Sequence, residues 1–198
     1  MKNFSIIFLF LLSLIAAFWF GNVFNKEDLI YESAGPGETK TEENDDSNIL
    51  ISEVFFGDKF IPPFVELYNT GYDVKDLSGF SIKKSSVGGN ESTFVSSKRF
   101  NNILINPRGY LLMSGASSAI KADIYWPKSY SLPKNNSVLS LYDSYGEKID
   151  EVSWSSPPQK SSLVRISWKE NYFSPTGDPT PQNSSGLINL VTSTQGSK

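Results

Sequence analysis

The sequence predicts an all-β domain, an antiparallel β-sandwich of two sheets, preceded by one apolar helix at the N-terminus. Three observations lead to this prediction. From Asn48 onward, short runs rich in β-branched and aromatic residues alternate with clusters of Gly, Pro, Asn and Ser. No long segment in that part repeats its apolar residues with a helical period. Residues 4–21, by contrast, form one uncharged apolar run without proline.

The N-terminal run has the length of a membrane-spanning helix. At ~1.5 Å per residue, its roughly 18 residues span about 27 Å, close to the ~30 Å hydrocarbon core of a bilayer. Lys2 precedes the run and Glu27 and Asp28 follow it, which favours an N-terminus inside and the remaining chain outside. We expect residues 1–24 to be a signal anchor of a single-pass cell-membrane protein whose C-terminal domain is extracytoplasmic. The alternative is a signal peptide, whose cleavage gives a secreted protein.

Residues 25–47 are predicted to be a flexible acidic linker. They combine a Gly-Pro-Gly stretch with the run Glu42, Glu43, Asp45 and Asp46, and they contain too little apolar surface to offset the entropy of ordering. The acidic run lacks the spacing of an EF-hand, so we interpret it as solvated charge. The sandwich then occupies residues 48–183, and the tail at residues 184–198 is either loose or adds one edge strand.

Alternation of side chains supports the individual strands. In residues 138–142, Leu139 and Leu141 point to one face and their neighbours to the other, and a hairpin turn follows at Gly146. Because successive strands follow one another without crossover helices, they are expected to pair antiparallel in two aligned sheets. The expected strands are residues 49–56, 64–68, 79–83, 93–96, 110–113, 138–142, 148–154 and 163–167.

Composition excludes most enzymatic mechanisms. The chain has 18 basic and 21 acidic residues, a net charge of -3, so it lacks the basic character expected of a nucleic-acid partner. It contains neither cysteine nor histidine, which removes thiol nucleophiles, disulfides, soft metal ligands and the usual general base. No closely spaced acidic pair stands beside a plausible base, and no G-x-S-x-G segment occurs. We therefore expect no catalytic residue, no cofactor and no enzymatic activity.

Several short motifs follow one another in a fixed order. They are ISEV at residues 51–54, FVELYN at 64–69, DLSGF at 76–80, INPRGYLL at 105–112, SLYDSYGEKIDEVSW at 140–154, SLVR at 162–165 and PTPQN at 179–183. In this order and spacing they resemble the lamin-tail domain family, found in nuclear lamins and in bacterial envelope and secreted proteins. The INPRGYLL segment, for example, is similar to the family pattern I-x-P-G-G-Y-L-L. The sequence departs from the family's glycine-aspartate at Asn136 and Ser137, and from its glycine at Gln182.

The resemblance implies an immunoglobulin-like sandwich of the bacterial membrane-anchored or secreted type. It also implies a non-catalytic binding or structural module. The alternatives are an accessory domain of a metal-dependent nuclease or phosphatase system, because bacterial members are often joined to such enzymes, and a module that binds calcium or glycan. The expected partners are the membrane, through the N-terminal helix, and a protein or cell-wall glycan.

We expect most of the motif residues to have structural roles. Gly79, Gly109 and Gly146 are expected to supply positive φ angles or close backbone approach. Glu66 lies among apolar neighbours, so its carboxylate needs a partner, for which Arg165 is a candidate. The expected core residues are Phe64, Leu67, Phe80, Leu111, Leu139, Leu141, Val152 and Trp154.

Two candidate sites remain. Asp143 and Asp150 are expected to cap turns through backbone amides, and the alternative is a calcium site that they form with carbonyl oxygens. The second candidate is an exposed aromatic platform for glycan or protein, which competes with a core role for the same residues. Its members are Tyr125, Trp126, Tyr130 and Tyr172.

Overall fold

The computed structural model describes residues 48–116 and 119–187. The predicted anchor at residues 1–24 and the predicted linker at residues 25–47 lie outside the described residues, as does most of the predicted tail. Within the described ranges, no helix is both long and apolar enough to cross a membrane.

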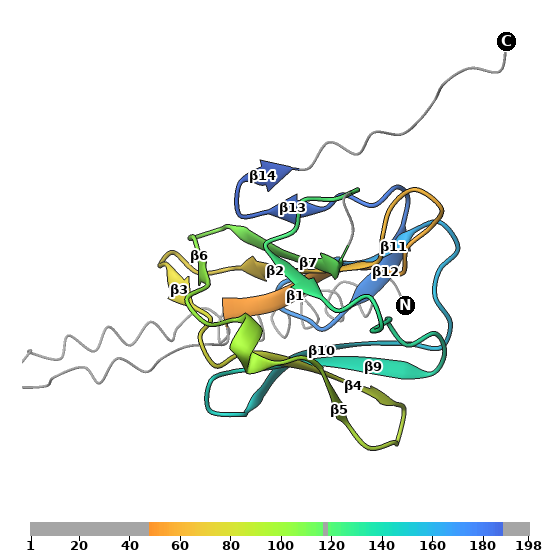
Figure 1. Ribbon diagram of the computed structural model, residues 1–198, viewed down its shortest axis with the longest axis horizontal. Coiled ribbons are helices and arrows are strands. Elements are labelled where there is room, and N and C mark those ends of the chain that lie inside the picture. The colour runs from red at the N-terminus through yellow and green to blue at the C-terminus, as the bar shows by residue number, and fades with distance from the viewer. Residues whose placement is uncertain (1–47, 117–118, 188–198) are drawn as a thin grey trace, which may run out of the picture. The chain divides into compact units, whose positions relative to one another are not determined.

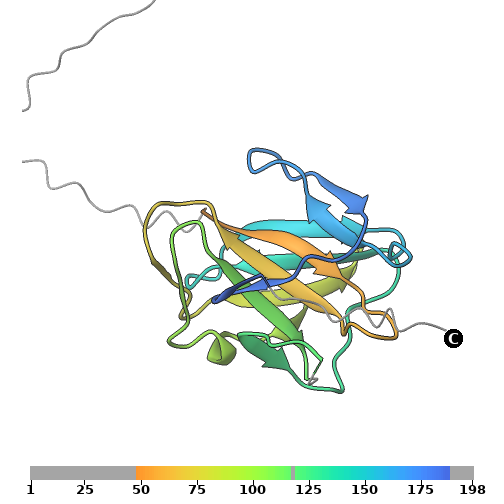
Figure 2. The same ribbon diagram turned by 90° about the horizontal axis from the view of Figure 1, so that it is seen from above.

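Two sheets make up the domain (Figures 1 and 2). The six-stranded sheet runs, in spatial order, β12 (Phe173–Thr176), β11 (Ser162–Arg165), β1 (Ile49–Phe55), β2 (Phe64–Asn69), β7 (Tyr110–Gly115) and β8 (Ile124–Trp126). The four-stranded sheet runs β10 (Lys148–Trp154), β9 (Ser137–Tyr142), β4 (Ser81–Ser86) and β5 (Ser92–Val95). Smaller elements are the pairs β3 (Lys75–Asp76) with β6 (Leu104–Ile105) and β13 (Gln182–Asn183) with β14 (Gly186–Leu187), and the 3-10 helix η2 (Ser97–Arg99). The all-β prediction is confirmed, and the arrangement is consistent with an immunoglobulin-like sandwich.

One pairing differs from the expected antiparallel arrangement. Strand β8 pairs parallel with β7, with Met113 opposite Ile124 and Gly115 opposite Trp126. All other strand pairs among the described residues are antiparallel. Only three residues of each strand pair in this way, so β8 is a short edge strand beside the C-terminal half of β7.

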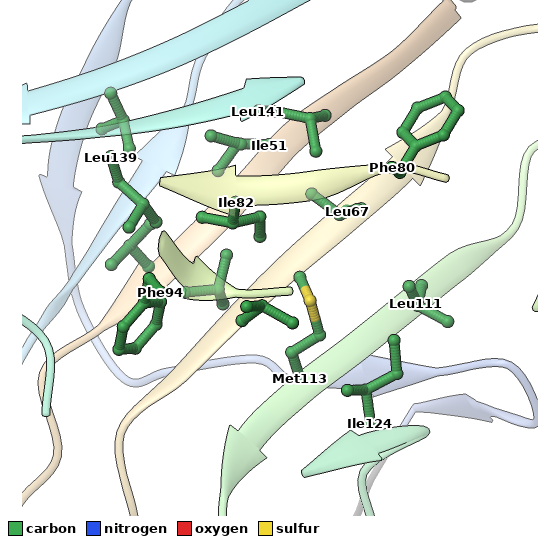
Figure 3. Packing of buried hydrophobic residues seen from close by; sticks show 14 of the residues in the cluster. Ile51, Leu67, Phe80, Ile82, Phe94, Leu111, Met113, Ile124, Leu139 and Leu141 are labelled. Carbon is green, nitrogen blue, oxygen red and sulfur yellow. The ribbon is translucent and has the colours of Figure 1, made fainter. Parts of the chain in front are cut away.

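The core lies between the two sheets. Alternate residues of facing strands point inward: Leu67 from β2, Met113 from β7, Ile82 from β4 and Leu141 from β9 are all completely buried. Figure 3 shows these side chains converging from both layers. The alternation predicted for residues 138–142 is therefore confirmed, because Leu139 and Leu141 belong to this core.

Phe64 is buried, as expected, but not in the main core. It belongs to a second apolar cluster with Phe55, Leu112, Ile120 and Ala122, and its ring centre lies 5.5 Å from that of Phe55. Phe64 and Leu67 are three residues apart on β2, and because strand residues alternate between faces, they point to opposite sides of the sheet. The six-stranded sheet is thus buried on parts of both faces.

Two of the expected glycine turns are formed, and one of them moves the start of a predicted strand. Gly79 has a φ of +90°, and a Cβ there would lie 2.9 Å from the Cβ of Ser144, so residue 79 belongs to a turn and β4 starts at Ser81. Gly109 is needed for a close approach to Asn106, because a Cβ at position 109 would lie 2.9 Å from the Asn106 carbonyl oxygen. The positive φ of this turn falls instead on Arg108, at +55°.

Candidate functional site

Asp143 shapes the turn between β9 and β10. Its Oδ1 accepts hydrogen bonds from the backbone N–H groups of Tyr145, at 2.9 Å, and Glu147, at 2.8 Å. The backbone of Asp143 also pairs with Glu147, whose carbonyl accepts from the Asp143 N–H at 3.0 Å. The expected turn-capping role of Asp143 is therefore confirmed.

Asp150 links the two sheets instead of capping a turn. Its Oδ2 accepts from the backbone N–H of Ile51 at 2.7 Å, and both of its oxygens accept from Nη2 of Arg165 at 2.5 and 2.6 Å. Arg165 in turn donates from Nε to the Ile51 carbonyl at 2.7 Å, and its guanidinium lies 4.6 Å from the ring centre of Phe173. Burial raises the pKa of Asp150, and the hydrogen bonds from Ile51 and Arg165 oppose that rise.

Protein donors thus already engage both candidate calcium ligands. In residues 48–116 and 119–187, no group of three or more acidic side chains is arranged to hold a metal ion. The calcium hypothesis remains a prediction from oxygen chemistry alone.

The four residues of the predicted platform occupy different environments. Trp126 is 1% exposed and packs with Phe94, their ring centres 4.9 Å apart, so it is a core residue. Tyr125 is half-buried, and its hydroxyl bonds to the backbone of Ile120 and Ala122 at 3.0 Å each. Tyr130 and Tyr172 are exposed. A single exposed platform of these four side chains is therefore not formed.

Two buried glutamates hold the C-terminal segment against the six-stranded sheet. Glu53 on β1 and Glu66 on β2 are opposite each other and each is 2% exposed. Glu53 accepts from the N–H of Thr180 at 3.1 Å and from its hydroxyl at 2.9 Å. Glu66 accepts from the hydroxyl of Ser52 and from the N–H of Gln182, both at 2.6 Å. The segment at residues 179–183 therefore covers both carboxyl groups.

This arrangement corrects the expected partner of Glu66. Arg165 pairs with Asp150, and Glu66 is satisfied by Ser52 and Gln182. Burial raises the pKa of Glu66 to about 8, hydrogen bonds from Ser52 and Gln182 oppose the rise, and the charge of Glu53 adds to it. The carboxyl pair is enclosed by the protein's own segment, so it does not form an accessible acid–base site.

A surface that the sequence reasoning missed lies where three loops meet. We call it the aromatic–arginine surface and define it as Tyr68, Tyr72, Arg108, Tyr110 and Trp168. The Tyr68 ring lies between two others, 4.7 Å from that of Tyr110 and 4.5 Å from that of Trp168. The Arg108 guanidinium lies 4.5 Å from the ring centre of Tyr72. Tyr72 is 81% exposed and Trp168 44%.

Strand geometry explains how these residues come together. Tyr68 and Tyr110 are direct cross-strand partners on β2 and β7, and the loops after β2, before β7 and after β11 supply Tyr72, Arg108 and Trp168. Hydrogen bonds to Tyr68 and then Tyr72 raise the pKa of Arg108, so it stays a cation. The sequence could have indicated part of this surface, because Tyr68 and Tyr110 lie in two of the quoted motifs. Trp168 comes near them only through the pairing of β11 with β1, which the sequence does not show.

The conformation of Arg108 is unusual for a residue with a side chain. Its φ of +55° is in the left-handed region, where a non-glycine residue costs about 1 kcal/mol or more relative to ordinary backbone. The same position holds glycine in the pattern I-x-P-G-G-Y-L-L that this segment resembles. A side chain is therefore present where glycine would fit with less strain.

Comparison with known proteins agrees with the fold. The sequence model of the family described as Lamin Tail Domain matches residues 42–156, which is more than half of the chain. No curated protein matches the chain. The matched residues run from just before β1 to the end of β10, and β11 to β14 extend the two-sheet fold beyond them. The chain therefore belongs to the lamin tail domain family.

Proposed function

We propose that this chain is a non-catalytic binding or structural module that its N-terminal segment anchors in a cell membrane, with the domain on the extracytoplasmic side. One observation carries the non-catalytic part. The buried acidic residues among those described, Glu53, Glu66, Asp143 and Asp150, each accept hydrogen bonds from protein donors. They support the fold, and the aromatic–arginine surface is the exposed feature that we propose for ligand binding.

The anchoring part rests on the apolar run at residues 4–21 and on the charges around it. A bacterial envelope is the proposed setting, and a protein or a cell-wall glycan the proposed class of partner. Nucleic acid is a poor candidate, because a net charge of -3 gives little electrostatic attraction to phosphates.

Protease accessibility of the full chain tests the location. The chain is produced in a bacterium, and protease is added to spheroplasts before and after lysis, with a cytoplasmic protein as control. We expect the domain to be digested in intact spheroplasts while the control survives, and the domain to remain in the cytosol when residues 1–24 are deleted. Protection of the full-length domain until lysis would contradict the proposal.

A phosphodiesterase assay tests the absence of catalysis and addresses the alternative role in a nuclease or phosphatase system. The full chain is incubated with a chromogenic phosphodiester and Mg²⁺ or Mn²⁺, since carboxylates can support metal-dependent hydrolysis without histidine. We expect no turnover above buffer. Metal-dependent turnover that disappears in Asp143→Asn or Asp150→Asn would show that the domain is an enzyme.

A further inference from the structure

We propose that the aromatic–arginine surface is a binding site for a polysaccharide whose sugar rings carry carboxylate groups, that is, a polyuronate. The inference rests on the proposed function, because it names the ligand class of a binding module. It assigns separate roles to the two chemistries at the surface: stacking by the aromatic rings and pairing of the sugar carboxylate by Arg108.

The exposed rings provide the stacking area. An exposed aromatic residue on its own needs no functional explanation, but here ring contacts join Tyr110, Tyr68 and Trp168 into one continuous group. Tyr68 is only 9% exposed and contacts the rings of Tyr110 and Trp168, whereas Trp168 is 44% exposed and Tyr72 81%. Rigid aromatic side chains present apolar area at a low entropic cost, and one face of a sugar ring is apolar because its C–H groups point that way.

Arg108 supplies the charge. The described residues contain three ion pairs, Lys83–Glu91, Lys148–Glu151 and Arg165–Asp150, and Arg108 belongs to none of them. Its guanidinium lies over the Tyr72 ring, 4.5 Å from the ring centre. A planar guanidinium can pair with a carboxylate through two parallel hydrogen bonds.

The sheet topology favours a sugar over an acidic peptide. One way in which an extended peptide binds a sheet is by adding a strand to a free edge. Tyr68, whose ring is at the centre of the group, lies on β2 between Leu50 of β1 and Tyr110 of β7, so no unpaired edge is present beneath its ring. A ligand on this face must therefore bind through side chains. A sugar ring can stack on the aromatic rings, and its carboxylate can pair with Arg108.

Calorimetric titration of the full chain in detergent micelles with oligogalacturonate tests the proposal. Three comparison ligands are a neutral galactan oligosaccharide, oligoglutamate and a phosphomannan fragment. We expect oligogalacturonate to bind at least about tenfold more tightly than each of the three, a difference of about 1.4 kcal/mol. Equal or tighter binding of oligoglutamate would identify a site for acidic peptides, equal binding of the phosphomannan would remove the carboxylate assignment, and no binding of oligogalacturonate would overturn the proposal.

Variants locate the site. Trp168→Ala and Arg108→Gln are each expected to weaken oligogalacturonate binding about tenfold or more, as for central residues of a binding site. Tyr145→Ala, at a residue 72% exposed in the β9–β10 turn, and Lys98→Gln on η2 are the matched controls and should bind as the wild type does. If Trp168→Ala does not fold, Tyr72→Ala serves in its place, because that side chain is 81% exposed. Unchanged binding in the folded surface variants would contradict the assignment.

The result is separable from that of the protease experiment. Binding to the purified chain does not depend on the side of the membrane on which the domain lies. If the domain is exported but does not bind oligogalacturonate, only this inference is overturned. If the domain is cytoplasmic but binds oligogalacturonate, only the proposed location is overturned.

Discussion

Replacing Arg165 with methionine should lower the free energy of unfolding by about 3–5 kcal/mol, the usual cost of removing one partner from a buried ion pair. The structure shows why. Arg165 makes two hydrogen bonds to Asp150, one to the Ile51 carbonyl and one to the Glu170 carbonyl, and its guanidinium packs on Phe173. Methionine keeps most of the packing but leaves Asp150 buried, with its N–H donor from Ile51 and without its cation.

The matched control is Lys148→Met. Lys148 and Glu151 form an ion pair at 2.7 Å, but their side chains are 47% and 39% exposed, so the expected loss is only about 0–1 kcal/mol. The double variant Arg165→Met, Asp150→Leu should recover part of the loss of the single variant, because no charge is then left without its partner.

Urea unfolding of the full chain, followed by tryptophan fluorescence and extrapolated linearly to water, measures these differences. A loss below about 1 kcal/mol for Arg165→Met, as small as that expected for Lys148→Met, would refute the reasoning. It would mean that Asp150 and Arg165 are hydrated and do not link the sheets.

Three further predictions concern Glu66, the glycine turns and the C-terminal segment. Burial raises the pKa of Glu66 from its ordinary value of 4.5 to about 8, so the protonated Glu66 stabilises the fold fully below about pH 4.5, and this stabilisation is lost as the pH rises through 8. Glu66→Gln should flatten this pH dependence in urea midpoints taken at about pH 5, 7 and 9. A variant whose midpoints change with pH as those of the wild type do would contradict the raised pKa of Glu66. Gly79→Ala should destabilise the domain by about 1 kcal/mol more than Gly146→Ala, because both residues have positive φ but only at Gly79 would a Cβ meet Ser144. Melting temperatures of the two variants measure this difference, and equal values would contradict the close approach. Thr180→Val removes a hydroxyl that donates to buried Glu53 and should cost about 1–3 kcal/mol in urea unfolding, whereas no loss would mean that water replaces the hydroxyl.

The sequence predicts the long strands well because their signal is local. Leu139 and Leu141 alternate with Val138, Ser140 and Tyr142, and the structure places both leucines in the core on β9. The strand expected at residues 148–154 matches β10. The short strands β3, β6, β13 and β14 are two residues each, too short for alternation to be visible, and β12 contains Pro175, which argues against a strand in sequence alone.

Contacts between distant segments cannot be predicted in the same way. The apolar neighbours of Glu66 indicate that it needs a partner, and it has one, but Gln182 is 116 residues away and donates through its backbone, which no side-chain pattern reveals. Trp126 is a candidate binding residue in the sequence, yet β8 turns it into the core beside Phe94. Conversely, Trp168 lies in a short loop without a motif of its own, and only the pairing of β11 brings it next to Tyr68.

Solution NMR of the isotope-labelled full chain in micelles, titrated with oligogalacturonate, tests the central claim most directly, because one series of spectra reports both binding and turnover. We predict that the largest amide shifts occur at Tyr72, Arg108 and Trp168, and that the sugar signals keep their intensity over days. Shifts concentrated at Asp143 and Asp150, or the growth of signals from shorter sugars, would contradict a non-catalytic module that binds through its aromatic–arginine surface.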